Sequence, residues 1–153
     1  MKTLFLHGLF AAVLAFTATH GYGQDANADI YGTWKVKALV GGGIGSRSQR
    51  QVDKVIGTLV VIGPTRFVFN GQACADVHYQ RSREETDHYF DVGWRTDVSD
   101  IHLPNPVTAI EMGCNIFLFP IRKDHLMIAD NSDFFETVRV RKASLRPATH
   151  SRP

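Results

Sequence analysis

The chain has 153 residues, and its 17 Lys and Arg nearly balance its 15 Asp and Glu, which leaves a formal net charge of +2. This balance excludes the broad basic face that nucleic-acid binding requires, so we expect no nucleic-acid partner. The length suits one ordinary domain, which can bury a hydrophobic core without a structural metal.

The first part of the chain has the pattern of a secretory signal peptide. Lys2 is the only charge before Asp25, and residues 4–16 are apolar or small apart from His7. That stretch matches a signal core of about 7–15 residues and is shorter than the roughly 20 residues that a membrane-spanning helix needs. We therefore expect an exported protein, with no stable membrane insertion once the signal is removed.

The expected cleavage site fixes the front boundary of the domain. Small residues at Gly21 and Gly23 suit a signal peptidase and predict a signal peptide over residues 1–23. A second possible cut precedes Asp29. The mature chain is then expected to be periplasmic or secreted, with its folded domain over residues 24–140.

The end of the chain differs in composition from the domain. Residues 141–153 contain four Lys and Arg, no acidic residue and two prolines. Such a segment cannot bury much apolar surface, so we predict a disordered basic tail. Its functional alternative is an arm that binds an acidic partner or a membrane surface.

Alternation of apolar and polar residues dominates the first half of the domain and predicts strands. Residues 30–38 alternate clearly, whereas residues 55–62 are apolar on both faces. Phe67 and Phe69 point the same way in a further strand, because alternate residues of a strand share a face. The glycine-rich residues 41–50 are predicted to be a flexible loop.

The middle of the chain is less regular. Residues 47–56 are the best candidate for a helix, with Ser48 as its cap. The polar residues 80–87 are predicted to loop out, and residues 88–94 form another apolar face.

The last third has the clearest strand pattern. Its four candidate strands cover residues 108–114, 115–121, 125–129 and 134–141. Short strands at regular spacing predict an all-β fold, a single antiparallel up-and-down β-barrel. The side chains expected inside this barrel, as core or as a ligand lining, are Phe67, Phe69, Phe90, Trp94, Phe117 and Phe134.

Two cysteines, Cys74 and Cys114, are present. In an exported chain an even number of cysteines predicts a disulfide. Closing a loop of about 40 residues stabilises a fold by roughly 4 kcal/mol in a chain-entropy model. The alternatives are two free thiols or half of a metal site, although the paired spacing that zinc sites favour is missing.

The Gly32-Thr33-Trp34 sequence in the first strand resembles the pattern of the lipocalins and the wider calycin group. The last third of the chain is also similar to small secreted bacterial lipocalin-like proteins that have no assigned function. The resemblance implies that Trp34 closes one end of the barrel and that Arg139, from the final strand, lies across its ring in a cation–π contact.

Residues that carry chemistry are few. Cys74, His78 and His88 lie within fifteen residues of one another, and such ligands suit zinc or copper, but their spacing fits no standard metal signature. We therefore expect no metal, with His78 and His88 as weak candidates, and no other cofactor. Glu84 and Glu85 are adjacent and would point to opposite faces of a strand, so they would not converge on one bond.

These observations favour a binding protein that is not an enzyme. The expected partner is a protein, and an inhibitor or immunity protein that binds a hydrolase is one example, with the loops at 41–50 and 80–87 reaching into its cleft. The alternative is a lipocalin-like carrier of a small hydrophobic ligand inside the barrel. A second alternative is a hydrolytic or metal-dependent enzyme, for which no nucleophile motif is visible.

Overall fold

The computed structural model describes residues 25–43, 45–99 and 101–141. The signal peptide predicted for residues 1–23 lies outside the described residues, as does all of the basic tail predicted for 141–153 except its first residue. Within the described part of the chain, no helix has the length and apolar character to cross a membrane.

Nine antiparallel strands form one sheet in the order β4-β3-β2-β1-β9-β8-β7-β6-β5. The strands are β1 (Gly32–Gly42), β2 (Leu59–Ile62), β3 (Arg66–Phe69), β4 (Gln72–Ala75), β5 (Gln80–Glu84), β6 (Val107–Glu111), β7 (Ile116–Arg122), β8 (His125–Asp130) and β9 (Asp133–Arg139). The helices are α1 (Gln49–Val55), α2 (Thr86–Tyr89) and the π-helical η1 (Phe90–Trp94). The predicted all-β, up-and-down class is confirmed.

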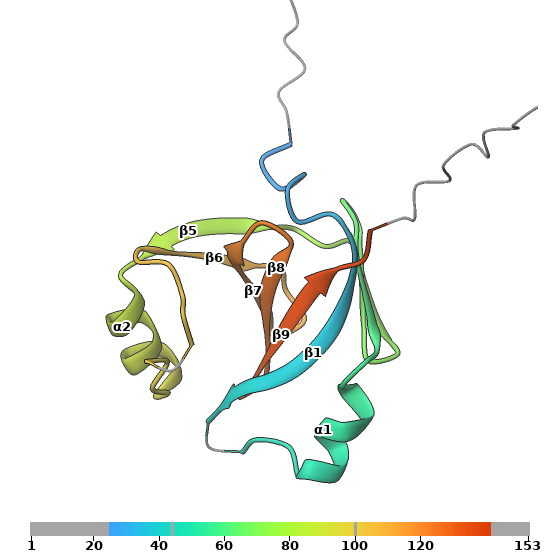
Figure 1. Cartoon of the computed structure of the whole chain (residues 1–153). Coiled ribbons are helices and arrows are strands. Elements are labelled where there is room, and N and C mark those ends of the chain that lie inside the picture. The colour runs from blue at the N-terminus through green and yellow to red at the C-terminus, as the bar shows by residue number, and fades with distance from the viewer. Residues whose placement is uncertain (1–24, 44, 100, 142–153) are drawn as a thin grey trace, which may run out of the picture.

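The first strand joins the two halves of the sheet. The start of β1 pairs with β2, and nearly its whole length pairs with β9, the last strand (Figure 1). Two register shifts, between Val36 and Ala38 and between Leu39 and Gly41, accompany this long pairing. Such bulges increase the local twist and bend of a strand, which helps the sheet to curl into a barrel.

The barrel is not hydrogen-bonded between β4 and β5, the two edges of the sheet. Cys74, in β4, forms a disulfide with Cys114, in the turn between β6 and β7, and this bond ties the two sides of the opening together. The Tyr79 hydroxyl donates a hydrogen bond of 2.8 Å to the Gly63 carbonyl across the same region. An intramolecular disulfide is compatible with an oxidising compartment outside the cytoplasm.

A densely filled core occupies the inside of the barrel. Its members come from all parts of the sheet and are buried: Trp34, Val36, Val60, Ile62, Phe67, Phe69, Ile110, Leu118, Leu126, Ile128 and Phe135. Phe69 packs against Phe67 and Phe135, with ring centroids 6.3 and 5.8 Å apart. We call this set the barrel core.

A second core lies on the opposite face of β6 to β9, beneath α2, η1 and the segment that follows them (Figure 1). Its buried members are Phe90, Val98, Val107, Ala109, Phe119, Met127, Ala129 and Phe134, with Trp94 and Phe117 packed against them. The prediction of one shared interior was therefore wrong for Phe90, Trp94, Phe117 and Phe134. The physical reason is that β7 and β8 are apolar at successive positions, so both of their faces need cover.

The loop predicted at residues 41–50 is shorter than expected, covering the described residues 43 and 45–48, and the loop predicted at residues 80–87 was wrong. β1 continues to Gly42, and Arg47 then anchors the following turn through ion pairs of 2.6 Å with Asp130 and Asp133. Residues 80–84 form β5, which pairs with β6. β5 is polar on both faces because it is an exposed edge strand, so alternation does not reveal it. The predicted helix is confirmed as α1, which Ser48 precedes as N-cap.

Replacing both cysteines tests the importance of the disulfide. We expect Cys74→Ser/Cys114→Ser to lower the free energy of unfolding by about 2–4 kcal/mol, because the unfolded chain regains the freedom of a long loop. Guanidinium denaturation followed by circular dichroism measures the change. Equal midpoints for the variant and the oxidised parent would contradict this prediction.

Candidate binding surface

The barrel interior leaves little room for a ligand. Phe67, Leu118, Leu126, Ile128 and Phe135 are fully buried in the barrel core. A carrier needs an internal cavity lined by apolar groups. Here large side chains fill the interior themselves, as they do in small barrels. The described residues therefore leave their outer surface as the place where a ligand or a partner could bind.

An uncovered apolar surface lies on the outer side of β9, β1, β2, β3 and β4. We call it the apolar face, and its members are Leu59, Val61, Val68, Ala73, Val138 and Val140. The strand register places these residues in adjacent rows. One row runs from Val140 through Thr33, Val61 and Val68 to Ala73. Neighbours within a row lie close enough to form a continuous patch.

Three of the larger members of the apolar face are exposed to solvent. The exposed fractions are 55% for Leu59 and 42% for both Val61 and Val140. β2 carries apolar residues on both of its faces, and its other face, with Val60 and Ile62, is buried in the barrel core. The sequence signal was visible in the doubly apolar residues 55–62, but it did not show which face would stay uncovered. Contiguous exposed apolar surface marks interaction sites.

Basic residues border this face, and four of its five strands contain no carboxylate. A second row is formed by Val138, Lys35 and Leu59, because Lys35 pairs with both of the other two residues. Lys37 and Arg66 are also exposed on these strands. β1, β2, β3 and β4 contain no Asp or Glu. None of Lys35, Lys37 and Arg66 forms an ion pair among the described residues, so this face presents apolar groups together with positive charge.

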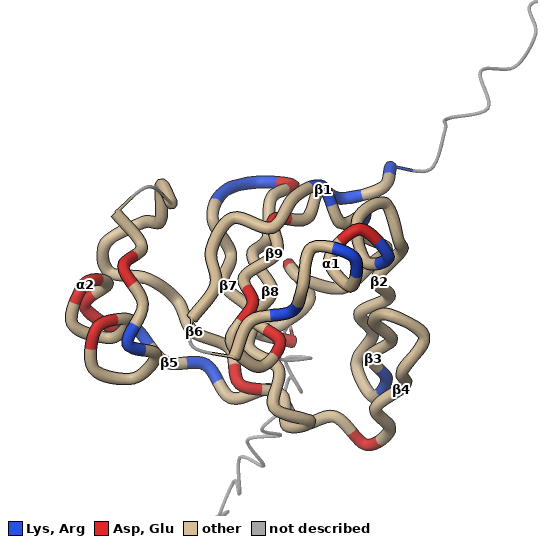
Figure 2. The backbone as a smooth tube through the Cα atoms, turned by 90° about the horizontal axis from the view of Figure 1, so that it is seen from below, with Lys and Arg blue, Asp and Glu red and all other residues tan. Residues whose placement is uncertain are grey.

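The opposite side of the molecule is acidic. Figure 2 shows one group of carboxylates around α2, and further carboxylates in the middle of the molecule, beside α1 and near the end of β4. Residues 84–99 contain five carboxylates, Glu84, Glu85, Asp87, Asp91 and Asp97, and one base, Arg95. We call this segment the acidic lobe. At its outer surface Val92 is 64% exposed.

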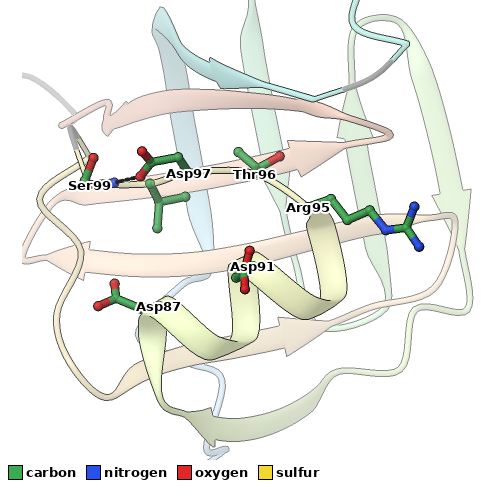
Figure 3. Close-up of a pocket in the computed structure, with 7 residues that line it drawn as sticks. Asp87, Asp91, Arg95, Thr96, Asp97 and Ser99 are labelled. Atoms are coloured by element: carbon green, nitrogen blue, oxygen red, sulfur yellow. Dashed lines mark hydrogen bonds between the residues drawn. The ribbon is translucent and has the colours of Figure 1, made fainter.

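A surface hollow of about 530 Å³ lies on the acidic lobe, lined by residues that include Asp87, Asp91 and Asp97. Figure 3 shows the Arg95 side chain pointing away from these carboxylates. The Ser99 N–H donates a hydrogen bond of 2.8 Å to Asp97 Oδ1 and holds the pKa of Asp97 below its usual value. That carboxylate thus stabilises its own turn.

The end of the barrel is closed as the resemblance implies. The Arg139 guanidinium lies over the Trp34 ring, 4.1 Å from its centroid. Arg139 also donates hydrogen bonds to the carbonyls of Tyr31 and Asp29. Trp34 Nε1 donates to the Ile30 carbonyl at 2.9 Å. These contacts attach the segment before β1 to the last strand.

His78 and His88, the two weak candidates for metal ligands, are both exposed. His88 is exposed in α2, where its backbone N–H donates to Glu85, and His78 is exposed beside the disulfide. No group of three or more His, Cys, Asp or Glu that could hold a metal occurs among the described residues.

A polar cluster that the sequence did not predict surrounds His125, beside the apolar face. His125 Nδ1 lies 2.9 Å from Glu136 Oε1, and Arg122 Nη2 lies 3.3 Å from His125 Nε2. With Nδ1 protonated toward the carboxylate, Nε2 accepts from Arg122. His125 also pairs with Val138 of the apolar face across the strand register.

A scan against protein-family models and searches of curated proteins and of solved structures find no match to this chain. The resemblance to lipocalins therefore stays a prediction that rests on the Gly-x-Trp sequence and the strand pattern.

Substitution of Trp34 tests the closure of the barrel. We expect Trp34→Ala to lower the free energy of unfolding by about 3–5 kcal/mol, because it removes a buried aromatic side chain. Trp34→Phe keeps a ring beneath Arg139 and should cost clearly less. Urea denaturation of the two variants beside the parent measures both effects. A Trp34→Ala protein as stable as the parent would refute the role given to this pair.

Proposed function

We propose that this chain is an exported, non-enzymatic binding protein of the periplasm or the extracellular space, and that it binds another protein through the apolar face. The observation that carries the proposal is the continuous exposed row from Val140 to Ala73, in a barrel whose interior is already filled. Protein interfaces combine a desolvated apolar centre with a polar rim.

The charges of the apolar face specify the partner's chemistry. Lys35, Lys37 and Arg66 are exposed on strands that contain no carboxylate. A partner that places apolar side chains against Leu59 and Val61 and carboxylates near these cations would complement the face. Complementary charge raises the association rate and excludes basic competitors.

A rigid surface of this kind suits an inhibitor or immunity protein whose partner is a hydrolase. A filled barrel, two cores and a disulfide favour a fixed shape, which lowers the entropy lost on binding. The carrier alternative would require the barrel core to open a cavity. The enzyme alternative would require reactive groups to converge.

Matched variants test the binding surface. The parent protein, Leu59→Asp and Val92→Asp are each used to capture partners from the exported fraction of the source cells. Both substitutions place a carboxylate at an exposed apolar site, but only Leu59 lies on the apolar face. We expect the parent and Val92→Asp to capture the same protein, and Leu59→Asp to bind it about tenfold more weakly or worse in calorimetry.

The charge requirement is measured with the same purified partner. Lys35→Glu should weaken binding, and added salt should weaken the parent complex because it screens exposed charges. Melting curves confirm that each variant is folded. Capture of no protein, or equal affinity for Leu59→Asp and the parent, would refute the proposed function.

A further inference from the structure

A second hollow lies at the end of the barrel where Arg139 covers Trp34, next to the Val138 side of the apolar face. It has a volume of about 460 Å³. The segment before β1 forms one wall with Asp29 and Ile30, and residues 120–126 of the β7–β8 hairpin form the other. Trp34 and Arg139 lie between these two walls.

The floor of this hollow is apolar. Trp34 and Leu126 of the barrel core lie at its base together with Ile30, and all three are buried, with exposed fractions of 3, 0 and 1%. Pro120 and Ile121 are half-buried and extend the apolar surface from the base of the hollow toward its rim. A ligand here would find a hydrophobic wall that is already fixed by the core.

The two carboxylates at the hollow are neutralised by cations. Asp29 pairs with Arg81. Asp124 pairs with Arg141 at 2.5 Å and with Arg139 at 3.3 Å. The hydrogen bond from Arg141, with the nearby positive charges, holds the pKa of Asp124 below its usual value. Neither carboxylate is available to balance a further cation.

Two cations at the hollow have no such partner. Arg122 and Lys123 are exposed, and neither forms an ion pair with any carboxylate of the described residues. The side-chain contact of Arg122 is with His125 Nε2 at 3.3 Å, a ring nitrogen whose partner nitrogen faces Glu136. The rim therefore carries two cations that form no ion pair among the described residues, above an apolar floor.

We propose that this hollow binds a small amphipathic carboxylate, with the carboxylate between Arg122 and Lys123 and the apolar body against Pro120, Ile121 and the small exposed part of Trp34. Guanidinium and ammonium groups form charge-assisted hydrogen bonds with carboxylates. An apolar pocket with a few polar anchors has the usual composition of a small-molecule site. The carboxylate belongs either to a free aliphatic acid or to the C-terminal residue of a peptide.

The two tryptophans provide an internal control for a test by nuclear magnetic resonance. Trp34 lines the hollow, and its indole N–H donates to Ile30. Trp94 packs against Phe117 and Phe134 in the second core. Sodium hexanoate is titrated into isotope-labelled full-length protein, and hexan-1-ol serves as the neutral comparison. We expect hexanoate to shift the Trp34 indole signal and the amides of residues 121–126 saturably, with the Trp94 signal unchanged.

Matched charge variants then test the anchors. Arg122→Gln/Lys123→Gln should bind hexanoate about tenfold more weakly, because it removes both cationic partners of the carboxylate, and a tenfold loss corresponds to about 1.4 kcal/mol. Lys35→Gln/Lys37→Gln removes the same charge from the apolar face and should bind like the parent. The amide spectra also show that each variant is folded.

The source of the carboxylate is decided by N-acetyl-leucine and its amide. Preference for N-acetyl-leucine over hexanoate assigns a peptide terminus, and the reverse assigns a free acid. Equal effects of hexanoate and hexan-1-ol, equal affinity of Arg122→Gln/Lys123→Gln and the parent, or shifts confined to other regions would overturn the proposal. None of these results bears on capture through Leu59, so the two proposals fail separately.

Discussion

The pairing of β1 with β9 is the constraint on which the rest of the structure depends. β1 is hydrogen-bonded to β2 on one side and to β9 on the other, so it joins two meanders into a single curled sheet. Arg139 reinforces this pairing at the end of β9, through its contacts with Trp34 and the Tyr31 carbonyl. If this junction were absent, β2 to β4 and β5 to β8 would each expose one face of the barrel core.

The arrangement of the same sheet explains why the molecule has two cores and leaves the apolar face uncovered. β7 and β8 are buried on both faces, because the barrel core covers one and the segment from α2 onward covers the other. β2 is apolar on both faces too, but the covering segment does not extend over it, and Leu59 and Val61 remain exposed. A strand that is apolar on both faces is therefore fully covered in one half of the molecule and left partly exposed in the other.

The sequence predicted those features that depend on local pattern. Alternation in residues 30–38 and the turns between the last strands predicted the meander, and Ser48 predicted the start of α1. The sequence pattern did not predict β5, because this exposed edge strand has no apolar face. The hollow beside Trp34 was equally out of reach, since it requires residues 29–30, 120–126 and 139 to converge in space.

The distribution of charge has a consequence for how this molecule meets others. Its formal net charge is small, but the acidic lobe and the strands with Lys35, Lys37 and Arg66 lie on opposite sides (Figure 2). Such a separation gives the molecule a dipole moment, and a dipole experiences a torque in the field of any charged surface. This separation favours orientations in which the strand side faces a negatively charged body.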